Sequence, residues 1–586
     1  MRILFIYICL MFYAHNMLSQ KKFDFDKTIL VGKESEVYSE RQIIIDEDNN
    51  KYLVSFFKGQ IDILNFTLST SINVTNNLSL DSKGLFVVKY DKNDSLLWAK
   101  KIAESETLLY YYADCDNSGN LYFSFQYKNS ILLENDTITC LDDGDICLIK
   151  YSPNGIKKFI KVFGNNGNET ITGFDFDNAN NIIVTGSFGL DTAINYPLTL
   201  DNYTIYSDKF GIFIATLDTL GTTVWAKSFD GNGYEGSTNL KYYDNSIYLM
   251  GYVYNSNVID IGGISITFPA NFDSKCFISK LDIAGNPVWI KKFGNQYNNN
   301  GLGYIIPKSL AVAGNRVCIT SIGIDQIQLV FLFEGAPNLA GGTSDFDYFI
   351  AAYDTSGNFK WNTIARSPYT ETLNQLSADS LGNVYGIGNM VFSSYFPNDT
   401  LYTNGSDDVL LCSYDSSGNF RWATHGGGVS TDIGSSIALD NNGKIFIVGG
   451  TTSSGGCMMG NDTLYPPANQ STMFFASLDS IDATWPLQNT VQFHESFQIE
   501  VYPNPAYKYL YVDMKQVETQ TKNEHTLIKM QNALGQIVYI TQVAEKHSNT
   551  PNSLHTIDIS SYPNGIYFFS LISDQQAISK KIIIQH

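Results

Sequence analysis

The sequence predicts an all-β protein, a seven-bladed β-propeller followed by a small immunoglobulin-like β-sandwich. Three observations lead there: an aromatic marker recurs along the chain, a turn residue precedes each marker, and the composition favours strands and turns. The 586 residues include 37 Tyr, 37 Phe and 46 Gly, and only 16% are charged. Such a composition is typical of extracellular all-β proteins.

The marker is a tryptophan. All six tryptophans occupy one position of a repeat, and a phenylalanine fills a seventh: Trp98, Phe159, Trp225, Trp289, Trp361, Trp422 and Trp485. Successive markers lie 61 to 72 residues apart. A turn residue stands seven positions earlier, or six in the last copy: Asp91, Ser152, Asp218, Asp282, Asp354, Asp415 and Asp479. We expect the markers to fill the same packing niche in every blade, because ligand-stacking residues have no reason to recur in each one.

Each copy is interpreted as four strands. A turn such as Asp116–Asn120 opens the copy, and an alternating strand follows it. A variable stretch is expected to hold the second strand, and a segment such as 86–90 forms the third. The second Asp turn then leads to the strand that carries the marker. Seven units of roughly 60 residues predict radial repetition, here over residues 25–488.

The two ends of this region indicate how the ring closes. Gly32 precedes Asp46 by 14 residues, and Gly164 precedes Asp177 by 13, so residues 29–32 match the end of a marker strand. Pro486 follows the last tryptophan and, lacking an amide proton, should curtail its strand. We therefore expect the N-terminal strand to complete the last blade, which leaves fewer exposed edges.

The recurring aspartates have two interpretations. Asp caps a turn through its carboxylate, and Gly adopts the positive φ that a short hairpin needs. Asp114, Asp116 and Ser118 also have the opening spacing of a calcium loop, but its twelfth position would be Phe125 rather than Glu. We favour structural turns, keep calcium as the alternative, and predict no other cofactor.

Catalytic signals are weak. His425 is the only histidine of residues 25–488, and neither a nucleophile elbow, a zinc-protease motif nor a phosphate loop is present. Glu334 lies in an apolar setting and is expected to end a strand. Two carboxylates suffice for a glycosidase, and no pair can be named among 58 acids. The sequence favours a non-enzymatic binding module, with a polysaccharide hydrolase or lyase that uses channel carboxylates as the alternative.

Charge and the first residues bound the location and the partners. The net charge is −20 and the pI about 4.7, so the basic footprint of a nucleic-acid binder is missing. Arg2 followed by the apolar run 3–14 predicts an export signal over residues 1–20. That run is too short to span a bilayer, and no later segment is long enough. We predict a secreted or surface protein that binds an extracellular glycan or protein.

The cysteines are expected to be buried apolar side chains. Cys147, Cys276 and Cys412 fall in the strand before the second Asp turn, where other copies carry apolar residues. Cys140 and Cys147 flank a turn-like stretch, which leaves a local disulfide open as an alternative.

The last ninety residues differ from the repeat. After an expected linker at 489–497, short alternating strands broken by Gly and Pro turns predict a β-sandwich over residues 498–586. Its motifs are Pro503, Asn504 and Pro505, a turn with Gly535, a strand with Gly565 and Tyr567, and the terminal pair Lys580 and Lys581.

Both regions resemble known families. Residues 25–488 resemble the bacterial β-propeller repeat family of secreted proteins, which implies the fold but no activity. Residues 498–586 resemble the type A C-terminal sorting domain of the type IX secretion system of Bacteroidetes. That resemblance implies recognition by the outer-membrane translocon, passage through the periplasm, and surface attachment or release. An adhesion or carbohydrate-binding sandwich is the alternative.

Overall fold

The chain divides into two compact units, Met1–Ile481 and Asp482–His586. The computed structural model describes residues 27–31, 35–63, 66–70, 82–134, 136–140, 144–165, 167–190, 195–231, 233–269, 272–296, 304–324, 330–336, 339–340, 346–365, 369–397, 399–460, 462–466, 471–478, 497–516, 526–532, 537–543, 553–572 and 577–586. The expected export signal, Gly32, Asp479, Trp485 and Gly535 lie outside these residues, as does the expected linker except for its last residue, Phe497.

The larger unit is built from antiparallel sets of four strands, and its described residues form no helix. We number the sets as repeats 1 to 7. Repeat 1 holds β2 (Ser35–Ile45), β3 (Lys51–Ile63), β5 (Lys83–Tyr90) and β6 (Leu96–Ser105), and repeat 2 holds β7 (Leu108–Cys115), β8 (Leu121–Tyr127), β11 (Asp145–Tyr151) and β12 (Lys157–Phe163). Repeat 3 holds β13 (Thr170–Phe176), β14 (Ile182–Gly189), β17 (Phe210–Leu217) and β18 (Thr223–Gly231), repeat 4 holds β19 (Tyr234–Tyr243), β20 (Ser246–Tyr254), β23 (Phe272–Asp282) and β24 (Pro287–Gln296), and repeat 5 holds β25 (Tyr304–Ala313), β26 (Arg316–Ile324), β29 (Phe346–Tyr353) and β30 (Phe359–Ile364). Repeat 6 holds β31 (Glu371–Ala378), β32 (Val384–Phe396), β33 (Asp399–Tyr414) and β34 (Phe420–Gly426), and repeat 7 holds β35 (Asp432–Leu439), β36 (Ile445–Thr451), β39 (Thr472–Leu478) and β1 (Lys27–Val31).

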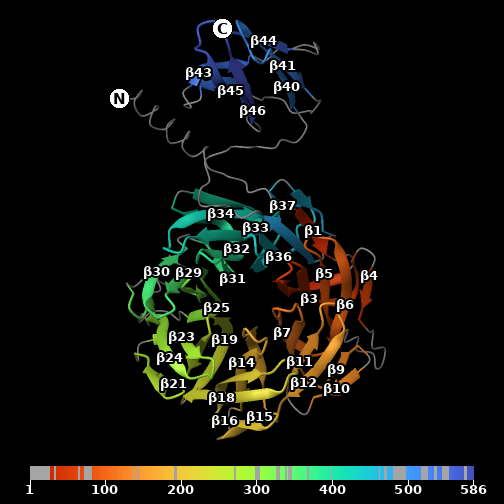
Figure 1. The fold of residues 1–586 in the computed structure, drawn as a ribbon, viewed down its shortest axis with the longest axis vertical. Coiled ribbons are helices and arrows are strands. Elements are labelled where there is room, and N and C mark those ends of the chain that lie inside the picture. The colour runs from red at the N-terminus through yellow and green to blue at the C-terminus, as the bar shows by residue number, and fades with distance from the viewer. Residues whose placement is uncertain are drawn as a thin grey trace. The chain divides into compact units, whose positions relative to one another are not determined.

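The repeats follow one another around a common centre in chain order (Figure 1). The first strand of each repeat, such as β7, β19 or β31, lies on the side of the centre. This inner strand precedes the opening Asp turn. Our expectation that the turn leads into the first strand of the copy was therefore wrong. The strand after the turn is the second of the sheet, and the variable stretch is not part of the four.

The variable stretch instead forms an accessory hairpin between the second and third strands. These hairpins contain β4 (Phe66–Ser69), β9 (Ser130–Leu133), β10 (Asp136–Thr139), β15 (Tyr196–Leu200), β16 (Tyr203–Ser207), β21 (Val258–Ile261), β22 (Ile264–Thr267), β27 (Val330–Phe333), β28 (Leu339–Ala340), β37 (Cys457–Met459) and β38 (Asp462–Leu464). Three of them pair with the fourth strand of the preceding repeat, through β9 with β6, β21 with β18 and β27 with β24. The hairpins therefore join neighbouring repeats.

The two ends of the larger unit meet in repeat 7. β1 pairs antiparallel with β39 along its whole length, as expected of a strand that completes the last blade. A hydrophobic cluster also joins Ile43 of repeat 1 to Phe446 and Phe475 of repeat 7. The backbone N–H of Ile43 donates to the Ser436 hydroxyl at 3.1 Å. Repeats 1 and 7 are therefore neighbours although about 390 residues separate their inner strands.

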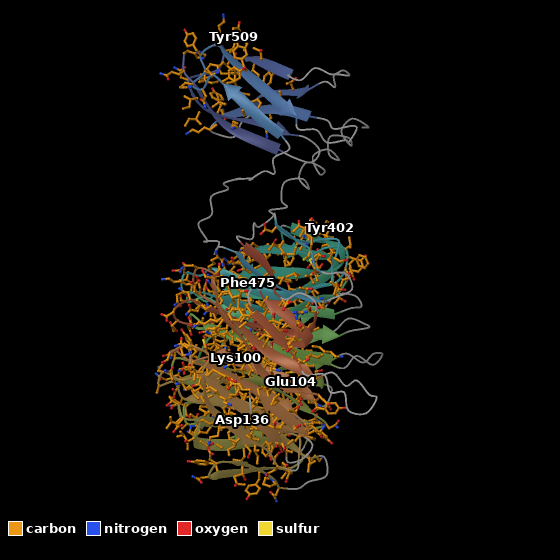
Figure 2. The ribbon with its side chains drawn as sticks, turned by 90° about the vertical axis from the view of Figure 1, so that its right-hand side faces the viewer. Lys100, Glu104, Asp136, Tyr402, Phe475 and Tyr509 are labelled. Carbon is orange, nitrogen blue, oxygen red and sulfur yellow. The ribbon has the colours of Figure 1, made fainter. Side chains whose placement is uncertain are left out.

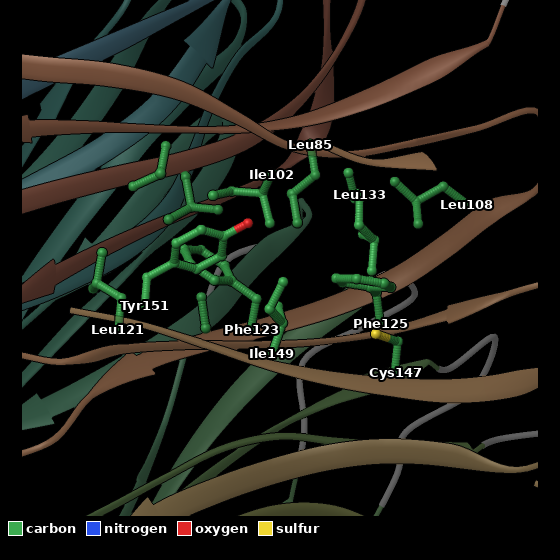
Figure 3. Packing of buried hydrophobic residues seen from close by; sticks show 14 of the residues in the cluster. Leu85, Ile102, Leu108, Leu121, Phe123, Phe125, Leu133, Cys147, Ile149 and Tyr151 are labelled. Carbon is green, nitrogen blue, oxygen red and sulfur yellow. The ribbon is translucent and has the colours of Figure 1, made fainter. Parts of the chain in front are cut away.

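The core consists of clusters that lie between consecutive repeats. Figure 3 shows the one between repeats 1 and 2, where Leu85 and Ile102 meet Phe123 and Cys147. Comparable clusters lie at each later junction. Cys147, Cys276 and Cys412 are free thiols that are at most 1% exposed, which confirms the expectation of buried apolar side chains.

The turn aspartates act as caps. The carboxylate of Asp116 accepts the backbone N–H groups of Ser118 and Asn120 at 3.0 and 2.9 Å. Its second oxygen accepts the hydroxyl of buried Tyr122 at 3.0 Å. Asp46 and Asp379 repeat this pattern. The aspartates thus satisfy their acceptor capacity within the hairpin, as the turn interpretation requires.

Five markers lie against the next repeat. Each contacts the glycine of the turn that precedes the next marker: Trp98 with Gly155, Phe159 with Gly221, Trp225 with Gly285, Trp289 with Gly357, and Trp361 with Gly418. A Cβ on these glycines would lie 2.5 to 3.6 Å from the ring. Trp361 and Trp422 are each 8% exposed, and the other described markers are partly buried against a core cluster.

The smaller unit is also all-β in its described residues. One sheet holds β40 (Phe497–Tyr502), β41 (Tyr509–Gln516) and β44 (Ser553–Asp558), and the other β43 (Ile537–Val543), β42 (Thr526–Asn532), β45 (Gly565–Ile572) and β46 (Ala577–Ile584). Leu510 and Val512 of the first sheet share one core with Met530, Phe569 and Ile582 of the second. In neither unit do the described residues form a helix able to cross a membrane.

Candidate ligand-binding site

A pocket of about 430 Å3 lies at the hairpin of β32 and β33 in repeat 6. Pairing of these strands continues past a bulge between Val391 and Ser393 to the pair Phe396 and Asp399, so the hairpin is long. The pocket is lined by Tyr369, Phe392, Ser393, Tyr402, Thr403, Asn404 and Gly405. Figure 2 shows Tyr402 at the edge of the larger unit. The sequence analysis did not identify this site.

Three aromatic side chains of the pocket are open to solvent. Tyr402 is 59% exposed, Phe392 58% and Tyr369 38%. The rings of Tyr369 and Phe392 lie 4.9 Å apart at 49°. Because burial of a ring is favourable, a group of exposed rings around one hollow indicates a binding surface.

Phe392 has an unfavourable backbone conformation. Its φ is 56°, in the left-handed region where Cβ crowds the following carbonyl. Most other non-glycine residues with positive φ in the described chain are Asn or Asp, which tolerate it better. Strained positions of this kind are common at ligand-binding sites, so the conformation of Phe392 is a second feature that distinguishes this hairpin.

A buried carboxylate holds Asn404, one of the residues that line the pocket. The backbone N–H and the side-chain amide of Asn404 donate to one carboxylate oxygen of Asp408, at 3.0 and 3.2 Å. The same oxygen lies 2.9 Å from Nδ1 of His425. Asp408 is fully buried, whereas the His425 side chain is 18% exposed. His425 of β34 therefore holds Asp408 of β33, and within the described residues no serine hydroxyl bonds to it.

Acidic residues also open several inner strands, which the sequence analysis missed. Glu169, Glu235, Glu371 and Asp432 are at most 2% exposed and stand at or next to the first position of β13, β19, β31 and β35. Burial raises the pKa of Glu169 and of Glu235 to about 7. The recurrence of an acid at the same position of several repeats was the sequence signal that could have revealed these residues.

One ion-paired group joins the inner strands of three repeats. The Lys241 ammonium lies 3.7 Å from a carboxylate oxygen of Asp114 and 3.7 Å from one of Asp175. Asp175 also accepts the backbone N–H of Tyr242 at 2.9 Å. Burial, more than the nearby Asp175 charge, raises the pKa of Asp114 to about 6. Asp114 and Asp175 are neighbouring carboxylates that the enzymatic alternative could use.

The remaining candidates have structural partners. Glu334 directly follows β27, and its carboxylate pairs with the Lys291 ammonium at 3.2 Å, so it ends a strand as expected. Among the residues that the structure describes, no group of three His, Cys, Asp or Glu side chains is arranged to hold a metal ion.

The terminal motifs of the smaller unit lie together. The side-chain amide of Asn504 donates to the Lys581 carbonyl at 2.9 Å, and its oxygen accepts the Ile583 backbone N–H at 2.8 Å. The hydroxyl of Tyr567 donates to the Pro563 carbonyl at 2.8 Å. The Pro-Asn-Pro segment is thereby attached to β46, and the side chains of Lys580 and Lys581 are exposed.

Comparison with known proteins identifies this segment. Residues 500–585 match the family described as the secretion system C-terminal sorting domain. The chain is also 22% identical over 490 residues to an uncharacterized WD repeat-containing protein of Acanthamoeba polyphaga mimivirus. That match covers 70% of this chain and 35% of the relative, so the chain spans about a third of the relative's length.

Solved structures add little. A Synechocystis apocarotenoid oxygenase mutant aligns at 11% identity over 57% of this chain and 65% of its own, with a TM-score of 0.28. Latent PorU from Porphyromonas gingivalis aligns at 9% identity over 74% and 36%, with a TM-score of 0.14. Neither likeness is close enough to carry an argument. The chain thus holds repeats and, in residues 500–585, a sorting domain of the kind that directs export by the type IX secretion system.

Proposed function

We propose that this chain is a type IX cargo of a Bacteroidetes cell, whose passenger is a closed seven-bladed β-propeller over residues 25–488. The pairing of β1 with β39 and the core cluster between repeats 7 and 1 support closure. Residues 498–586, an immunoglobulin-like sandwich, are the part that the outer-membrane translocon recognises, and residues 1–20 are the signal for entry to the periplasm.

The passenger acts by binding rather than by catalysis. The observation that carries this proposal is the repeat 6 pocket, whose lining combines exposed rings with uncharged polar side chains. None of the residues that line it is an acid, a histidine or a cysteine. Such a lining can hold a ligand, and its serine, threonine and tyrosine hydroxyls have no lining acid or histidine beside them to act as the base that a hydroxyl nucleophile needs.

A polysaccharide hydrolase or lyase is the second candidate. Asp114 and Asp175 lie on adjacent inner strands, and the raised pKa of Asp114 suits a general acid. Lys241 contacts both carboxylates, however, and Asp175 also accepts a backbone N–H of repeat 4. These contacts make the group a link between repeats, so binding remains the preferred function.

One assay separates the two candidates. The full chain is applied to immobilised polysaccharides and extracellular-matrix proteins, and both retention and release of new reducing or unsaturated ends are measured. Retention on at least one surface without product is the expected result. Product release that Asp114→Asn abolishes would establish the enzyme instead, and the absence of both retention and product would contradict the binding function.

A further inference from the structure

We propose that the repeat 6 pocket is a subsite for an uncharged polysaccharide chain, with Phe392 and Tyr402 as stacking platforms. This inference rests on the proposed binding function and names its ligand class. The faces of sugar rings carry C–H groups that pack on aromatic rings, while their edges carry hydroxyls that need hydrogen-bond partners. The pocket supplies both kinds of surface.

The polar part of the lining matches hydroxyl groups. The Thr403 hydroxyl donates to the Gly405 carbonyl at 2.9 Å, and the Asn404 amide donates to Asp408 and to the Gly427 carbonyl. The side-chain oxygens of these two lining residues therefore act as acceptors toward sugar hydroxyls, which can donate. Since no lining residue is charged, an anionic polysaccharide would lose hydration without gaining an ion pair, so the ligand is an uncharged one.

The apolar surface continues from the pocket into repeat 7. A Cβ placed on Gly405 would lie 2.4 Å from the backbone of Val429, whose side chain is 74% exposed. The Val429 side chain in turn lies 4.0 Å from the Cβ position of Gly455, and the ring of Tyr465, which is 68% exposed, lies 3.4 Å from the Cβ position of Gly456. Exposed apolar side chains therefore continue beyond the residues that line the pocket, which favours an extended chain over a single sugar.

The pocket is also held in place before a ligand arrives. The side-chain amide of Asn404 donates to the Asp408 carboxylate and, at 3.3 Å, to the Gly427 carbonyl. The backbone of Phe392 is held in the left-handed region, and its ring is exposed. Groups fixed in advance lose less conformational entropy on binding, which favours a function in recognition.

The test measures retention of the full chain on four polysaccharides in affinity gels: the uncharged β-glucan, xylan and mannan, and the anionic alginate. Tyr402→Ala and Phe392→Ala should each weaken retention by the uncharged gels about tenfold, since roughly 1.4 kcal/mol corresponds to that factor. Tyr402→Phe keeps the ring and should retain most of the binding. Tyr206→Ala removes a ring that is 53% exposed on the repeat 3 hairpin and should leave retention unchanged.

Each result decides the proposal. Retention by an uncharged gel that Tyr402→Ala and Phe392→Ala do not weaken, in variants whose circular dichroism matches the parent, would overturn the site. Retention only by alginate, or only by the matrix proteins of the earlier binding assay, would overturn the ligand class while leaving the binding function intact. Failure to bind any surface would contradict the binding function itself.

Discussion

The contact between Trp361 and Gly418 gives the sharpest prediction about stability. We propose that the markers lock neighbouring repeats together, with each ring packed on the turn glycine of the next repeat. Gly418 has a φ of 85°, and a Cβ added there would lie 2.5 Å from the Trp361 ring. Gly418→Ala therefore introduces both backbone strain and a steric overlap.

The two costs can be separated with a matched control. A left-handed alanine costs about 1–2 kcal/mol, and overpacking a filled site costs about 1–3 kcal/mol. We expect Gly418→Ala to lower the free energy of unfolding by about 2–5 kcal/mol, the sum of these ranges. Gly59 has a similar φ of 79° with nothing within 4 Å of the Cβ position, so Gly59→Ala should cost only about 1–2 kcal/mol.

Urea unfolding followed by circular dichroism measures both variants, and a double-mutant cycle tests the cause. Trp361→Ala alone should cost about 3–5 kcal/mol. In that background Gly418→Ala should cost no more than Gly59→Ala, because the ring it would strike is gone. Equal costs for the two glycine variants in the parent chain, or an unchanged cost of Gly418→Ala without the ring, would refute the packing role.

Three further outcomes follow from the structure. Removing residues 27–31 exposes the edge of β39, so the melting temperature should fall and light scattering should show self-association, whereas removing residues 1–20 should change neither. The pKa of Glu169 is raised to about 7 from roughly 4.3 in an unfolded chain, so its contribution to stability is present below pH 4.3 and lost as the pH rises through 7. Glu169→Gln keeps an acceptor for the Tyr196 hydroxyl. Between pH 5 and 8 its melting temperature should fall less than that of the parent chain, and an equal fall would contradict a raised pKa of Glu169. The free energy of unfolding of Phe392→Gly should exceed that of Phe392→Ala by about 1 kcal/mol, because glycine relieves the left-handed strain. A more stable Phe392→Ala variant would refute that strain.

The sequence predicted what the repeat itself encodes. Marker spacing and the Asp turns predicted an all-β repeat, and the short segment before Gly32 predicted the strand that pairs with β39. The strand assignment within a copy was off by one place, because the inner strand lacks a turn or tryptophan signal of its own. The sequence of one copy also does not show whether its variable stretch pairs with itself or with the preceding repeat.

The candidate site was beyond sequence reasoning for a different reason. Tyr369 precedes β31, Phe392 is the bulge residue of β32, and Tyr402 lies in β33, so residues from three separate segments form the site. Their exposure and the φ of Phe392 arise from the folded hairpin. The chain has 37 tyrosines and 37 phenylalanines, so the pattern alone could not distinguish these from core residues.

Export through residues 498–586 can be tested by fractionation of the producing bacterium. The full chain, a chain without residues 498–586, and a periplasmic reporter carrying residues 498–586 are each located among periplasm, cell surface and medium, with protease resistance as the measure of folding. We expect the full chain and the reporter to reach the surface or medium, and the truncated chain to stay folded in the periplasm. Equal surface delivery of the truncated chain would show that residues 498–586 are not an export signal.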